Sequence, residues 1–197
     1  MKRVYGGGVS AQQKLLSVNK KLGNIGIRGQ QGTTRQIYDG ILIEGQTLYR
    51  FFRDAKSKKF PFTNLNENRL AVGETMAVER AYFMVAIFDS AGSVLNLESA
   101  FFTNNNFTFG DFNFTIGTSE VIKPIKMTSF GATFNKNATF ENYTNFEFDT
   151  QLVIPPLLEF ESVLELPVGV AADVSNDAFL FMVLEGVGSL IAPKTTF

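Results

Sequence analysis

From Ile37 onward the chain consists of apolar segments of strand length, separated by clusters of turn-forming residues. In Leu157–Leu166, apolar and acidic residues alternate, as expected of a strand with one buried face. The residues expected on the buried side are Leu158, Phe160, Leu164 and Leu166, and those on the other side are Glu159, Glu161 and Glu165. Turn clusters such as Asp89-Ser90-Ala91-Gly92 recur at spacings of about ten residues. The pattern predicts an all-β sandwich or barrel of about eight strands.

The boundaries of these segments follow from local chemistry. In Phe107–Ile116 the alternation slips at Gly110-Asp111, which predicts a bulge or tight turn. Pro155-Pro156 prevents one continuous strand across it, and the polar, Asn- and Pro-containing stretch Phe60–Gly73 predicts a long loop. The segments with strand character are Ile37–Glu44, Thr47–Arg53, Thr75–Asp89, Val94–Phe102, Phe107–Ile116, Glu120–Met127, Thr144–Ile154, Leu157–Leu166 and Asp177–Val187.

Charge divides the chain into a basic beginning and an acidic remainder. Residues 1–36 hold seven basic residues and no acidic one, and residues 1–59 hold twelve basic and three acidic residues. Residues 60–197 hold six basic and sixteen acidic residues, although the whole chain has a net charge of only −1. We therefore predict a basic, Gly- and Gln-rich N-terminal arm over residues 1–36 and a β body over residues 37–197.

Two basic clusters are candidates for contact with a polyanion, because phosphate contacts need only accessible positive charge and no sequence preference. The residues of the arm are Lys2, Arg3, Lys14, Lys20, Lys21, Arg28 and Arg35. The residues of the second cluster, which is interleaved with aromatic side chains, are Arg53, Lys56, Lys58 and Lys59. An exposed Lys-rich loop at the end of a strand is an equally good interpretation of the second cluster.

The chain lacks the residues and motifs of most catalytic sites. It has no Cys and no His, which excludes thiolate and imidazole chemistry, and it has no nucleophile elbow or phosphate loop. Glu159, Glu161 and Glu165 could form a carboxylate pair, but we favour a solvated strand face. We expect no enzyme, no catalytic residue, no metal and no cofactor. Without an uncharged apolar run of about 18 residues, we also expect no transmembrane segment.

Several stretches are similar to structural proteins of tailless bacteriophages, and a basic arm ahead of a β body resembles viral jelly-roll capsid proteins. The stretches are Tyr49-Arg50-Phe51-Phe52-Arg53-Asp54, Thr63–Asn68, Gly73-Glu74-Thr75-Met76, Phe148–Pro156 and Phe179–Gly186. The resemblance implies a single eight-stranded jelly-roll sandwich with an extended basic arm. It also implies that the arm lies on the inner side of a particle and that the sheets meet neighbouring subunits.

The leading hypothesis is a structural virion protein, a capsid or vertex subunit, made in the host cytoplasm and located in the virion. Its expected partners are further copies of the chain, other virion proteins and, through the arm, nucleic acid bound without sequence preference. The alternative is a carbohydrate- or receptor-binding β-sandwich, with Asn- and aromatic-rich loops at Asn104–Phe109 or Asn135–Tyr143. A nucleic-acid-binding barrel of the OB type ranks third, because the body is acidic.

Overall fold

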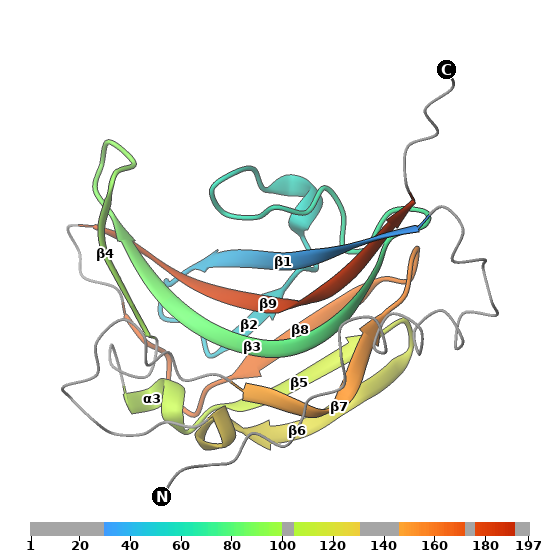
Figure 1. Ribbon diagram of the computed structural model, residues 1–197. Coiled ribbons are helices and arrows are strands. Elements are labelled where there is room, and N and C mark those ends of the chain that lie inside the picture. Colours follow the sequence, from blue (N-terminus) through green and yellow to red (C-terminus); the bar gives the residue numbers. More distant parts are fainter. Residues whose placement is uncertain (1–29, 100–104, 131–145, 172–175, 192–197) are drawn as a thin grey trace, which may run out of the picture.

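Two antiparallel β-sheets lie face to face in the computed structural model, which describes residues 30–99, 105–130, 146–171 and 176–191 (Figure 1). The strands of the first sheet are β1 (Gln30–Leu42), β9 (Asp177–Ile191), β3 (Thr75–Phe88), β7 (Phe146–Ile154) and β4 (Val94–Ser99). The strands of the second sheet are β2 (Leu48–Phe51), β8 (Phe160–Glu165), β5 (Asp111–Ile116) and β6 (Ser119–Lys126). The short helical elements are η1 (Ala55–Ser57), α3 (Asn105–Thr108) and η2 (Met127–Phe130).

The strands pair in a nested order. β1 pairs with β9, β2 with β8, β3 with β7, and β5 with β6. Across the sheets these pairs give the strand orders β1-β9-β3-β7 and β2-β8-β5-β6. β4 stands outside the nesting, because it forms a hairpin with β3 and shares with β7 the edge of β3 that β9 leaves free. Most of these pairs join strands far apart in the sequence, and the first and last described strands, β1 and β9, lie side by side in one sheet.

The core between the sheets is built by alternation along the strands. In β5, Phe112, Phe114 and Ile116 are buried, and the residues between them are only partly buried. The ring of Phe83 in β3 lies 5.7 Å from that of Phe51 and 5.8 Å from that of Phe112, so it joins the two layers. Close packing of such rings supplies most of the apolar burial that stabilises a sandwich.

The structure confirms the predicted all-β class and differs from the sequence expectations in some strand limits. The described part of the chain contains nine strands, where about eight were expected, and each overlaps one of the nine segments with strand character. The chain breaks at Pro155-Pro156, as predicted, but the next strand begins only at Phe160, and Leu158 is exposed rather than buried. Residues 60–73 contain no named strand, in agreement with the predicted loop.

The predicted strand Phe107–Ile116 is wrong in its first part. Asn105–Thr108 forms one helical turn, and β5 begins at Asp111. Gly110 lies between the two elements, and a Cβ there would come within 2.8 Å of Leu164 and 2.9 Å of Leu166. A side chain here would crowd these two leucines, which favours glycine. Hydrogen bonds of 3.3 Å from the Phe109 N–H to the Asn106 carbonyl and from the Gly110 N–H to the Phe107 carbonyl show that the slip in the alternation marks a turn.

The boundary predicted between residues 36 and 37 lies inside β1, which begins at Gln30. Residues 30–36 pair in register with residues 185–191 of β9, which also extends beyond the predicted limit at Val187. The polar, Gly-containing sequence of this stretch hides the strand, because its stability comes from backbone pairing with a distant segment. Residues 1–29 of the predicted arm lie outside the described residues. Within the described ranges, no helix has the length and hydropathy that a bilayer crossing demands.

Candidate functional site

The long loop between β2 and β3, residues 52–74, lies along the outer edge of β1 (teal, above β1 in Figure 1). Loop residues form hydrogen bonds with backbone groups on the free edge of β1, which would otherwise bond to water. The Phe62 carbonyl accepts from the Gly40 N–H at 2.7 Å, and the Asn64 side chain bonds the backbone of Gln36 and Tyr38. The loop is therefore docked on the body.

A buried carboxylate anchors the start of this loop. Asp39 is fully buried, and its Oδ2 accepts hydrogen bonds from the Phe52 N–H at 2.7 Å and from Lys58 Nζ at 2.6 Å. Burial raises the pKa of Asp39, and the charge of Lys58 opposes that rise. Phe52 has a φ of 69°, an uncommon value for a side chain of this size. The bond from its N–H to Asp39 holds the chain in that conformation.

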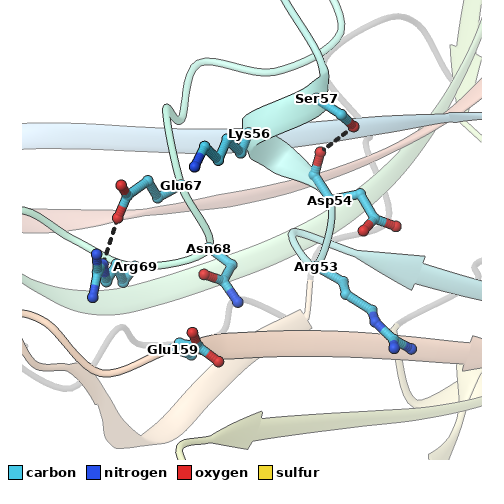
Figure 2. A pocket seen from close by; sticks show the side chains of 8 residues that line it. All are labelled: Arg53, Asp54, Lys56, Ser57, Glu67, Asn68, Arg69 and Glu159. Carbon is cyan, nitrogen blue, oxygen red and sulfur yellow. Dashed lines mark hydrogen bonds and ion pairs between the residues drawn. The ribbon is translucent and has the colours of Figure 1, made fainter.

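Beside the anchor, the loop and the residue before β8 border an open hollow of about 470 Å³, which we call the basin (Figure 2). The residues lining the basin are Arg53, Asp54, Lys56, Ser57, Glu67, Asn68, Arg69 and Glu159. An adjoining hollow of about 490 Å³ shares Arg53, Asp54, Asn68 and Glu159 with it. This second hollow extends the basin to Arg50, Thr115, Gly117, Phe160 and Glu161.

Charges of both signs line the basin. Arg69 Nε donates to Glu67 Oε2 at 2.5 Å, and Arg50 donates to Glu161 at 3.0 Å. The hydrogen bond and charge of Arg69 lower the pKa of the Glu67 carboxyl, and Lys56 adds to the effect. Figure 2 shows the Lys56 ammonium extending toward Glu67, with Arg53 on the opposite side of Asn68. Among the described residues, neither Arg53 nor Lys56 is in an ion pair with a carboxylate within 4.0 Å.

The basin offers hydrogen-bond donors and acceptors to a polar ligand. Its hydroxyl group, Ser57 Oγ, donates to the Asp54 carbonyl at 2.7 Å. Phe160 forms part of the wall of the second hollow, but its ring is buried against Phe52, at 5.3 Å between centroids. The described lining therefore suits binding through charge and hydrogen bonds rather than through an exposed aromatic platform.

The predicted polyanion-binding residues have different environments. Lys2, Arg3, Lys14, Lys20, Lys21 and Arg28 lie outside the described residues. Arg35 donates to Glu74 at 2.7 Å, and Lys58 is held by Asp39, so both cations are engaged within the body. Arg53 and Lys56 line the basin, and Lys59 is exposed on the turn that follows η1. Contact of any of these residues with a polyanion stays a prediction.

Sequence reasoning missed Asp39, which anchors the loop, and several polar residues of the basin, including Asn68 and Arg69. Asp39 carried a usable signal, since it interrupts an apolar alternation that includes the buried residues Ile37 and Ile43. A charge at such a position needs a partner, because an isolated buried carboxylate is very costly. Glu161 and Glu165 lie on the outer side of β8, as predicted, and Glu159 precedes the strand and lines the basin. Loop residues 135–143, one candidate for glycan contact, lie outside the described residues.

Comparison of the chain with protein-family models, with curated proteins and with solved structures finds no match.

Proposed function

We propose that this chain is a structural virion protein, a capsid or vertex subunit that assembles through its β body. The observation that carries the proposal is the nested strand pairing, first strand with last and middle strands with each other. This order supports a jelly roll of eight strands, with β4 as an addition to it. Jelly rolls are common in capsid proteins and also occur in lectin domains, so the fold alone does not select between these functions.

Apolar surface on the first sheet favours assembly over a solitary binding domain. Val94 and Leu95 in β4 are 58% and 56% exposed, and Leu97 of the same strand packs on an aromatic cluster on the outer face of the first sheet. The centre of this aromatic cluster is already buried, but apolar residues at its margin are exposed. Such an exposed apolar margin is typical of a surface that a neighbouring subunit covers.

The N-terminal arm differs from the body in the sign of its charge. Residues 1–29 hold six basic and no acidic residues, whereas the described residues hold ten basic and seventeen acidic ones, a net charge of −7. A basic arm on an acidic body suits contact with the genome, a membrane or neighbouring subunits, and other virion proteins are further partners in the particle.

The experiment that tests assembly is light scattering on the full chain during size-exclusion chromatography at low salt. We expect closed oligomers or particles, and we expect Leu95→Glu to shift the mass toward monomer. Val121→Glu is the matched control, because Val121 is 45% exposed on β6 of the second sheet. A monomeric wild-type chain at every salt concentration would contradict the proposal, as would equal effects of the two variants.

The basin supports a second candidate, a carbohydrate- or receptor-binding β-sandwich. Its charged and amide side chains provide the donors and acceptors that hydroxyl-rich ligands need. Binding of an oligosaccharide to a monomeric chain, lost in Asn68→Ala and retained in Val121→Glu, would favour this candidate over the capsid subunit.

A further inference from the structure

The turn Lys59–Phe62 displays an aromatic ring to solvent. It is closed by a hydrogen bond of 2.8 Å from the Phe62 N–H to the Lys59 carbonyl. Phe60, in the middle of the turn, is 83% exposed, more than any other large apolar side chain in the described part of the chain. Phe62, two residues later, lies against Phe179 with 4.4 Å between ring centroids. The same turn therefore packs one partly buried ring against the sheet and leaves the other exposed.

The segment that carries Phe60 is firmly attached to the body. Ala55 is fully buried, Lys58 reaches the buried carboxylate of Asp39, and Thr63 is buried beside β1. These contacts lie on both sides of Phe60 in the sequence. A ring held at the tip of an anchored turn loses little conformational entropy when it contacts a ligand, and such preorganisation favours binding.

Cations precede this ring in the sequence. In the segment 53–60, Arg53, Lys56 and Lys59 are exposed, Lys58 is neutralised by Asp39, and Asp54 is the one acidic residue. The segment thus presents a net charge of about +2 in its unpaired side chains, next to an exposed aromatic ring. Of the other acids that line the basin, Glu67 is paired with Arg69, and Glu159 interacts electrostatically with the same arginine.

We propose that this segment, the basic–aromatic loop Arg53–Phe60, binds single-stranded nucleic acid, with a base stacked on Phe60 and phosphates near Arg53, Lys56 and Lys59. Single strands alternate a negative phosphate with an aromatic face at every nucleotide, which matches cations beside an exposed ring. An acidic protein partner fits less well, because protein interfaces are depleted of Lys and bury an apolar centre, whereas Phe60 stands among charges. The inference goes beyond assembly and does not require it.

The test uses the full chain and fluorescence anisotropy with a labelled oligothymidylate of about 20 nucleotides, and inorganic polyphosphate as a competitor without bases. We expect Phe60→Leu to weaken oligothymidylate binding about tenfold and to leave competition by polyphosphate unchanged. Phe109→Leu is the matched control, since Phe109 is 64% exposed next to α3, away from the basic–aromatic loop. Thermal unfolding of each variant verifies that the fold is retained.

A charge variant tests the phosphate contacts separately. Lys59→Gln should reduce the slope of log affinity against log salt by about 0.7, the contribution of one phosphate contact on a single strand. Lys123→Gln, at an exposed position on β6, should leave the slope unchanged. In this scheme the arm contributes to nucleic-acid affinity through charge alone. None of the four variants changes the arm, so its contribution to the measured affinity is the same in all of them.

Three results would overturn the inference. The first is that the wild-type chain does not bind the oligonucleotide. The second is that Phe60→Leu and Phe109→Leu bind it with equal affinity. The third is that Phe60→Leu loses as much affinity for polyphosphate as for oligothymidylate. If Phe60→Leu instead lowers the mass of the assembled species and keeps full oligonucleotide affinity, Phe60 is a subunit contact. Light scattering on the same samples separates failure of this inference from failure of the assembly proposal.

Discussion

In both sheets, inward-facing and outward-facing residues alternate along the strands, but the outer faces of the two sheets differ in what covers them. On the second sheet the outer face carries ion pairs, as in Arg50 with Glu161 and Lys126 with Asp111, and its exposed apolar residues include Leu48 and Val121. On the first sheet, half of the outer face is an aromatic cluster over which the β2–β3 loop lays Phe62. The other half is polar, with Tyr82 and Arg80 bonded to Glu185.

This difference explains why the long loop has a fixed place. Water satisfies the polar face of the second sheet, whereas the aromatic half of the first sheet gains stability only when something covers it. Phe62 supplies part of that cover, and the Asp39–Lys58 pair fixes the loop that carries it. The contact that stabilises the fold therefore also positions the cations and the ring proposed to bind nucleic acid.

The largest expected effect comes from breaking the anchor of the loop. Asp39→Ala leaves the Phe52 N–H and the half-buried Lys58 ammonium without their acceptor. Removal of one partner from a buried ion pair costs about 3–5 kcal/mol, so we expect a loss of this size in the free energy of unfolding measured with urea. Asp111→Ala, which breaks an exposed pair on the second sheet, should cost less than about 1 kcal/mol. Equal losses would contradict the contrast between the faces.

A smaller effect is expected from uncovering the aromatic face. Phe62→Ala removes a partly buried ring that lies against Phe179 and Phe88, and we expect a loss of about 2 kcal/mol in the free energy of unfolding. The exposed cluster should also bind an apolar dye more strongly in the folded state. Phe109→Ala, at a ring that is already exposed, should change neither quantity. Unchanged dye binding in Phe62→Ala would show that the loop does not shield this face.

The smallest effect concerns pH. The pKa of Asp39 in the folded chain is raised from 3.8 by burial, so the folded state keeps its proton at pH values where the unfolded state has lost it. The contribution of Asp39 to stability therefore falls as the pH rises from about 4 through the raised pKa. Asp39→Asn keeps an oxygen acceptor for Phe52 and removes the titration, so stability should fall less over this window than in the wild type. Urea unfolding over a pH series measures the difference, and parallel curves would exclude a raised pKa.

Local sequence patterns predicted the positions of strands and loops along the chain better than they predicted which strands pair. The break at Pro155-Pro156 and the long polar loop after Phe60 follow from local backbone chemistry, and both are present. The start of β1 at Gln30 was not predictable from its polar composition, because its partner, Ile191 in β9, lies about 160 residues away. In the candidate site, Arg53 and Lys56 were predicted as a basic cluster, but Lys58 was not distinguishable from them.

Residue order along the chain is enough to predict the all-β class, the buried side of strands such as β5 and β8, and the division between a basic beginning and an acidic remainder. Long-range packing, in contrast, pairs Lys58 with Asp39 and leaves Lys59 and Phe60 facing solvent. The reason is physical: alternation is a property of neighbouring residues, whereas the burial of a charge depends on which distant segment is packed against it.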